Sequence, residues 1–174
     1  LGYLHPRGRT LLYTPQLVQP NMPEKVVGEI KIQSQADLDM WRTDNMVARF
    51  EDGMIKGDGI AFDPKMEIDI ELDTTKIAGL EIMLRSVEGS KDASKAKSLH
   101  SPFDVFFATE DEPQYSESKK LAKMTCDRNG ASVMLGSTVP TWKGKVTKIR
   151  IDPTNSVGSF ELEYIKILAW DKKK

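Results

Sequence analysis

The segment 66–73 alternates strictly between apolar and acidic side chains. The apolar residues are Met66, Ile68, Ile70 and Leu72, and the acidic residues are Glu67, Asp69, Glu71 and Asp73. Successive side chains of a β-strand point to opposite faces of the sheet, so one face of this strand is buried. Like charges in a row repel, so we expect the acidic face to lie in water or to pair with lysines of a neighbouring strand. The pattern predicts a half-buried strand.

Similar short segments recur along the chain, separated by turn signals. The sequence predicts about ten strands and no convincing amphipathic helix. The predicted strands are residues 26–32, 36–41, 45–51, 54–56, 66–72, 77–85, 103–109, 119–126, 131–135, 146–151 and 160–168. Asp52-Gly53 and Asn129-Gly130 are hairpin signals, and Gly57 and Gly59 are expected to break the strand pairing that precedes them. This organisation predicts an all-β sandwich.

The last predicted strand changes phase part of the way along. Phe160, Leu162 and Tyr164 share one face, but the next apolar residues are Ile165 and Ile167. The period therefore slips by one residue after Tyr164. A β-bulge, or a strand covered on both faces, would explain the slip.

Composition places the chain among soluble globular proteins. It has 174 residues, 39% of them apolar and 29% charged, which suffices for one domain with a sizeable core. The net charge of −1 gives no reason to expect nucleic acid or an anionic membrane as a partner, and no apolar run is long enough for a membrane span. Residues 1–25, with four prolines, are expected to form an extended arm, and residues 26–174 a single module. Because the chain begins at Leu1, we expect it to be part of a longer or processed protein.

Three stretches, in chain order, carry a resemblance to a known family. They are Gly53–Pro64 (GMIKGDGIAFDP), Phe103–Lys119 (FDVFFATEDEPQYSESK) and the C-terminal segment 141–168 (TWKGKVTKIRIDPTNSVGSFELEYIKIL). Together they resemble carbohydrate-binding-module-like domains, which are jelly rolls of two antiparallel sheets attached to secreted bacterial glycoside hydrolases and to cell-surface proteins. The resemblance implies a monomeric, secreted or cell-surface module that binds a polysaccharide or oligosaccharide. It also implies linked catalytic or surface-anchoring domains in the parent chain.

Carbohydrate binding requires aromatic rings for the C–H faces of sugars and planar polar groups for their hydroxyls. Aromatic residues are scarce, so the candidates are few: Trp41, Tyr115, Trp142 and Trp170 for stacking, and Arg85 and Lys119 for hydroxyls. Each aromatic candidate also has a structural alternative. Trp41 and Trp142 could belong to the core, Tyr115 could anchor its own loop, and Trp170 could cap the sandwich. The sequence leaves both roles open.

Two kinds of calcium site are considered. The acidic face of segment 66–73 offers oxygen ligands, but the EF-hand loop spacing is absent and a solvated strand face is the favoured explanation. The resemblance implies a structural calcium ion bound near the first and last strands. The residues in those places are Glu29 and Glu163, and Glu163 is longer than the aspartate found in the family.

The residues expected of common enzyme classes are missing from the sequence. It has no Gly-rich phosphate loop, no G-x-S-x-G motif and no paired histidines. A single cysteine, Cys126, excludes an internal disulfide and is expected to be a small packing residue. The favoured function is a non-catalytic carbohydrate-binding module. The alternatives are a structural or protein-interaction module without a sugar site and, less favoured, a small glycan-active enzyme, which would need only two carboxylates.

Overall fold

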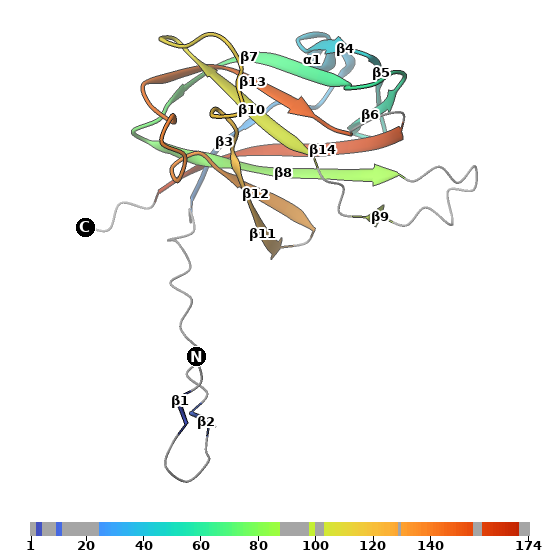
Figure 1. Ribbon diagram of the computed structural model, residues 1–174. Coiled ribbons are helices and arrows are strands. Elements are labelled where there is room, and N and C mark those ends of the chain that lie inside the picture. Colours follow the sequence, from blue (N-terminus) through green and yellow to red (C-terminus); the bar gives the residue numbers. More distant parts are fainter. Residues whose placement is uncertain are drawn as a thin grey trace.

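The computed structural model describes residues 3–4, 10–11, 25–87, 98–99, 103–128, 130–154 and 158–170. Nearly all of its elements are strands (Figure 1). In chain order they are β1 (Tyr3–Leu4), β2 (Thr10–Leu11), β3 (Lys25–Ile30), α1 (Gln35–Asp39), β4 (Arg42–Asp44), β5 (Met46–Glu51), β6 (Met54–Gly59), β7 (Lys65–Asp73), β8 (Ile77–Val87), β9 (Ser98–Leu99), β10 (Asp104–Thr109), β11 (Ala122–Arg128), β12 (Ala131–Leu135), β13 (Lys145–Asp152) and β14 (Gly158–Ala169). No helix within these ranges is long and apolar enough to cross a membrane.

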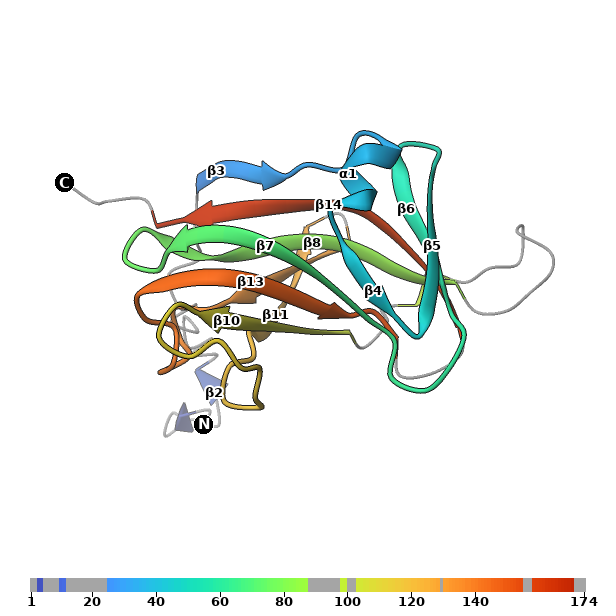
Figure 2. The same cartoon turned by 90° about the horizontal axis from the view of Figure 1, so that it is seen from above.

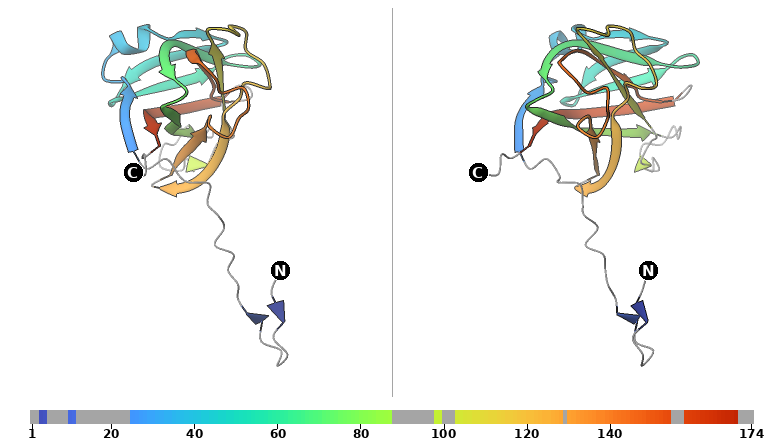
Figure 3. Two further views of the ribbon diagram at one scale, coloured as in Figure 1. Left: turned by 90° about the vertical axis from the view of Figure 1, so that its left-hand side faces the viewer. Right: turned by 60° about the vertical axis from the view of Figure 1, so that its left-hand side comes forward.

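Apart from β1 and β2, which pair only with each other, the strands form two antiparallel sheets packed face to face, which confirms the predicted all-β sandwich (Figures 1 and 2). One sheet has four strands in the order β10-β13-β7-β4. The other has eight, in the order β11-β12-β8-β14-β6-β5, with β3 paired to β14 and β9 paired to β8. Figure 3 shows the two layers from the side, with β14, in red, below the four-stranded sheet. The core lies between the layers and includes Ile55, Met66, Phe107, Ile149 and Leu162, all fully buried.

The central strand β14 contains the predicted irregularity. In its pairing with β8, Leu162 lies opposite Leu84 and Tyr164 lies opposite Met83, so Glu163 is an extra residue. Leu162 and Ile165 are both buried, three positions apart instead of two. The phase slip is therefore a β-bulge, one of the two explanations that the apolar pattern offered, but it lies before Tyr164 and not after it.

The prediction of a strand at residues 36–41 is wrong, because this part of the chain forms the short helix α1. Ser34 caps it: the Ser34 hydroxyl accepts a hydrogen bond from the Asp37 N–H at 3.3 Å. The Asp37 carboxylate in turn accepts one from the Gln33 N–H at 2.8 Å. These reciprocal bonds satisfy free N–H groups at the start of a helix, and they override the weak alternation that suggested a strand.

The predicted strand 45–51 is confirmed as β5, which begins one residue later, at Met46, because the chain changes sheets at Asn45. This residue has a φ of 56°, a left-handed conformation that asparagine tolerates. The preceding strand β4 belongs to the four-stranded sheet, and the following strand β5 belongs to the eight-stranded sheet. Asn45 is thus the corner that joins the two layers.

Both predicted hairpins are present, but the predicted break at Gly57 and Gly59 is wrong. Asp52 and Gly53 have φ values of 54° and 76°, as a two-residue turn between β5 and β6 requires. Strand β6 continues through Gly59, because the ring of Phe160 lies directly over Gly57 and occupies the space of a side chain. Glycine here permits close packing and does not end the strand.

Several sequence predictions fall outside the described residues. They include most of the arm predicted for residues 1–25, within which β1 pairs with β2. Of the segment 87–100, only Val87 and β9 are described, and the side chain of Cys126 is not described.

Candidate binding pocket on the four-stranded sheet

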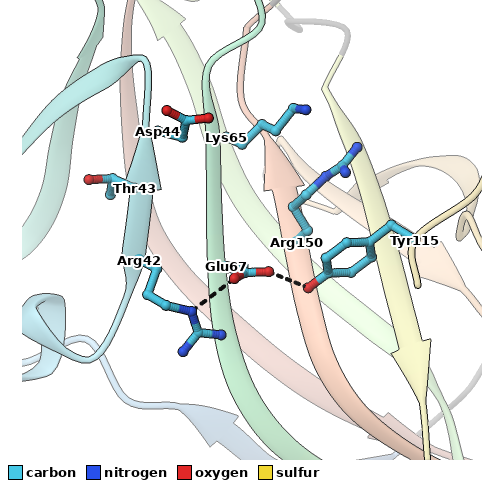
Figure 4. A pocket seen from close by; sticks show the side chains of 7 residues that line it. All are labelled: Arg42, Thr43, Asp44, Lys65, Glu67, Tyr115 and Arg150. Atoms are coloured by element: carbon cyan, nitrogen blue, oxygen red, sulfur yellow. Dashed lines mark hydrogen bonds and ion pairs between the residues drawn. The ribbon is translucent and has the colours of Figure 1, made fainter. Parts of the chain in front are cut away.

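A polar pocket of about 240 Å³ opens on the outer face of the four-stranded sheet (Figure 4). Strand β4 contributes three lining residues, β7 two, β13 one and the loop after β10 one. The lining residues are Arg42, Thr43, Asp44, Lys65, Glu67, Tyr115 and Arg150.

The register of the sheet brings the central residues together. Arg42 lies opposite Glu67 across the β4–β7 pair, and Arg150 lies opposite Glu67 on the other side. Phe106 lies opposite Arg150, which completes one row across all four strands. Residues that pair directly across antiparallel strands point to the same face. The alternation of β7 sets that face, because the apolar side chain of Met66 points into the core and Glu67 points outward.

The Glu67 carboxylate is held from two sides, as the dashed lines in Figure 4 show. Arg42 donates from Nε to one carboxylate oxygen at 2.8 Å, and the Tyr115 hydroxyl donates to the other at 2.7 Å. Arg42 also donates to both oxygens of Asp69, at 2.9 and 3.3 Å. The acidic face of β7 is therefore partly neutralised by a neighbouring strand, as predicted, although the partner is mainly arginine.

Arg150 forms the opposite wall of the pocket in a fixed orientation. Its Nε and Nη2 donate to the two oxygens of Asp152 at 2.8 and 3.0 Å. Its guanidinium carbon lies 4.3 Å from the ring centre of Phe106 and 4.9 Å from that of Tyr115. Stacking and a two-point carboxylate contact together restrict the guanidinium to one plane.

These contacts shift the pKa values of the pocket residues. Burial of the Tyr115 hydroxyl and its hydrogen bond to Glu67 raise the pKa of Tyr115, so this hydroxyl stays protonated at neutral pH. Burial alone would raise the pKa of Glu67, but the hydrogen bonds from Arg42 and Tyr115 outweigh it and lower this pKa. The Arg42 hydrogen bond also lowers the pKa of Asp69. At neutral pH the pocket therefore holds ionised side chains and one neutral phenol.

The lowered carboxyl pKa values predict a loss of stability in acid. Above about pH 4.3, the pKa of an unfolded glutamate, the Glu67 and Asp69 carboxyl groups are ionised in both the folded and the unfolded protein. The contacts of these carboxylates then contribute fully to the free energy of unfolding. As pH falls further, the unfolded carboxylates take up protons before Glu67 and Asp69 do in the folded protein, so the free energy of unfolding decreases. We expect urea unfolding at about pH 7, 5, 4 and 3 to show this decrease, and the Arg42→Ala variant to show a shallower one.

Asp152 changes the free energy of unfolding in the opposite direction. Because burial raises the pKa of Asp152, the stability that this group contributes is present in acid and is lost as pH rises. Arg42 is not among the groups that shift Asp152, so its effect cancels between the wild-type and Arg42→Ala proteins. Parallel pH profiles for the two proteins would contradict the assignment of the Glu67 and Asp69 shifts to Arg42.

Of the six predicted carbohydrate-binding residues, the pocket contains Tyr115 alone. Trp41 and Trp142 are 6% and 7% exposed and lie in the core between the sheets, as the structural alternative expected. Their rings offer no free face to a ligand. Arg85 and Trp170 belong to the other sheet, where Arg85 pairs with Glu163 at 3.4 Å and Trp170 follows the end of β14, partly buried.

The two predicted calcium ligands also lie on the eight-stranded sheet. Glu163 is the bulged residue of β14 and pairs with Arg85, and Glu29 lies exposed on β3. Within the described part of the chain, no three Asp, Glu, His or Cys side chains come together as a possible metal site. The calcium site implied by the family resemblance stays a prediction.

Lys119, predicted to meet sugar hydroxyls, is instead buried at 3% exposure. Its Nζ donates to the carbonyl oxygens of Glu112 and Gln114 and so holds the loop that carries Tyr115. Replacing it with methionine leaves two partly buried carbonyls without this donor, so we expect the free energy of unfolding to fall by about 1–3 kcal/mol. Urea denaturation measures this change. The matched control is Lys120→Met, which removes surface ion pairs and a cation–π contact with Phe106 and should cost about 1 kcal/mol or less. Equal losses in the two variants would contradict the structural role of Lys119.

Comparison with known proteins adds no relative to this description. The chain matches no protein-family model, and no curated protein matches it in sequence. The fold and the pocket are the observations from which a function is argued.

Proposed function

We propose that the chain is a non-catalytic carbohydrate-binding module that holds one sugar unit of a polysaccharide in the pocket of the four-stranded sheet. The observation that carries this proposal is the row Arg42–Glu67–Arg150 with Tyr115 beside it. These are planar polar side chains held in fixed orientations around one cavity. Hydroxyl-rich ligands are recognised by groups of this kind, because each hydroxyl both donates and accepts hydrogen bonds.

The pocket retains donors and acceptors for such a ligand. A guanidinium carries five N–H donors, and Asp152 accepts two from Arg150. Among the residues that the structure describes, none pairs with the Asp44 carboxylate, which therefore offers acceptors at the pocket wall. The volume of the pocket, about 240 Å³, lies below the roughly 300–1,000 Å³ of sites for drug-sized molecules. A single sugar ring suits this space better than a larger ligand.

The state of the Glu67 carboxylate supports binding over catalysis. A glycosidase needs one carboxylic acid that keeps its proton near neutral pH, which requires a raised pKa. Glu67 has a lowered pKa, and both of its oxygens already accept hydrogen bonds. It is therefore arranged as a fixed anion and not as a proton donor.

In this proposal the module acts by proximity. It would hold a linked catalytic or surface-anchoring domain of an extracellular parent protein near its polysaccharide and so raise the local concentration. The family resemblance supports the extracellular setting and a structural calcium ion, which belong to the proposal.

Affinity electrophoresis tests the proposed function. The 174-residue chain is run through gels containing soluble β-glucan, xylan, mannan or pectin, with calcium and with chelator. Retardation by at least one polymer is the expected result, and loss of retardation in chelator would indicate a metal that shapes the site. Unchanged migration in every gel, with folding verified by circular dichroism, would contradict the proposal.

The burial of Trp41 and Trp142 favours one alternative function. It removes two of the aromatic rings expected to stack on sugars, so a structural or protein-interaction module without a sugar site is the second candidate. A protein partner in pull-down experiments, combined with no polysaccharide retention, would establish that alternative.

A further inference from the structure

The most exposed large apolar side chain in the described part of the chain is Phe62, at 81% exposure. It lies between β6 and β7, in the loop 60–64. A single exposed apolar residue is ordinary on a protein surface. Phe62 differs from such residues in two ways: the backbone around it is held by hydrogen bonds, and its loop adjoins the pocket.

The backbone around Phe62 is held in place. The side-chain amide of Asn45 donates to the Phe62 carbonyl oxygen at 2.9 Å, and the Ile60 N–H donates to the Asn45 carbonyl oxygen at 2.9 Å. Asn45 and Asp63 both have positive φ values, 56° and 62°, which are uncommon for residues other than glycine. Two hydrogen bonds and two unusual conformations thus fix a short loop whose aromatic side chain points into solvent.

The loop adjoins the pocket through both of its connections. Asn45, which holds the Phe62 carbonyl, directly follows the pocket residue Asp44. Lys65, another pocket residue, comes three positions after Phe62, so the connecting chain spans at most about 11 Å. Figure 2 shows this loop turning beside the corner between β4 and β5. The backbone of Phe62 therefore lies within about 11 Å of Lys65, at the end of the pocket formed by Asp44 and Lys65.

We propose that Phe62 is a stacking platform for a second sugar unit of a chain whose first unit occupies the pocket. This inference rests on the proposed function. A phenyl ring has no polar atoms and packs against the C–H face of a sugar, whereas the pocket supplies hydrogen bonds to hydroxyls. An apolar ring beside a polar pocket matches the two surfaces of an oligosaccharide longer than one unit.

A protein ligand fits these observations less well. Stable protein interfaces bury about 800 Å² on each partner around a well-packed apolar centre. Near Phe62 the exposed large apolar side chains of the described residues are Ile60 and Val47, and the polar residues Asp58, Asp63 and Lys65 lie among them. This small apolar area suits one sugar ring.

The test compares oligosaccharides of one to six units, prepared from β-glucan, xylan, mannan and pectin, by isothermal titration calorimetry on the full chain. Phe62→Ala should weaken binding of oligosaccharides of two or more units by about fivefold and leave the binding of monosaccharides unchanged. Phe62→Tyr keeps the ring and should keep the affinity. The matched control is Met40→Ala, which removes another exposed apolar side chain, 67% exposed, just after α1.

The outcomes separate this inference from the proposed function. If Phe62→Ala binds every length like the wild type while Glu67→Gln loses affinity, the pocket stands and the stacking platform is refuted. If the wild-type protein binds none of these sugars, the proposed function fails and the inference fails with it. If Phe62→Ala abolishes capture of a protein partner and leaves sugar binding intact, the ring belongs to a protein interface and the inference is overturned.

Discussion

Replacing Trp142 by alanine is expected to lower the free energy of unfolding by about 3–5 kcal/mol, the cost of removing a large aromatic side chain from a core. The indole ring is 7% exposed and meets Phe107 edge to face, with ring centres 5.0 Å apart. Its Nε1 donates to the Ile77 carbonyl oxygen at 2.9 Å, and the ring packs against Gly136. The substitution therefore opens a cavity and removes the hydrogen bond that ties the segment before β13 to β8.

Urea denaturation monitored by circular dichroism measures this loss. Trp170→Ala serves as the control, because Trp170 is partly exposed after the last strand and should cost less. A loss below about 1 kcal/mol for Trp142→Ala, together with abolished sugar binding, would show instead that Trp142 is a ligand-stacking residue.

Replacing Glu67 by glutamine is expected to weaken carbohydrate binding by about tenfold or more while the fold is retained. The glutamine presents one oxygen and one NH₂ group where the carboxylate accepted from Arg42 and from Tyr115. If the amide oxygen faces Arg42, the NH₂ group meets the Tyr115 hydroxyl, which must then accept a hydrogen bond instead of donating one, and both charge-assisted hydrogen bonds are lost. Hydrogen bonds to charged groups contribute about 1.5–3 kcal/mol, which corresponds to roughly ten- to hundredfold in affinity.

Affinity electrophoresis against the polymer that retains the wild type measures this change. Glu71→Gln is the matched control, since it makes the same substitution on the same strand, outside the pocket lining and at a side chain 83% exposed. Wild-type retention of the Glu67→Gln variant would mean that the pocket is not the sugar site.

Local patterns in the sequence were sufficient for much of the fold. The alternation from Met66 to Asp73 predicted a strand with one buried face, and Asp52-Gly53 predicted the β5–β6 hairpin. The phase slip near Tyr164 indicated an irregularity in the last strand, and the structure shows it as a bulge at Glu163 in β14. Each of these features depends on residues close together in the chain, where steric and turn preferences act directly.

The site could not be predicted in the same way, because it is assembled across strands. Arg42, Glu67 and Arg150 are far apart in sequence and meet only through the register of β4, β7 and β13. Tyr115 was found because it lies in a loop of the kind that carries binding residues. Trp41 and Trp142 were candidates for sugar binding but lie in the core. A tryptophan in a single sequence gives no sign of which side of a sheet it faces.

Chemical-shift mapping by NMR tests the central claim most directly. The ¹⁵N-labelled chain is titrated with oligosaccharides from β-glucan, xylan, mannan and pectin, and backbone amide shifts are followed. The account predicts shifts concentrated in residues 42–44, 65–67 and around Tyr115 and Arg150, with the eight-stranded sheet unchanged. Shifts confined to the surface around Arg85 and Trp170, or no shifts with any of these sugars, would contradict it.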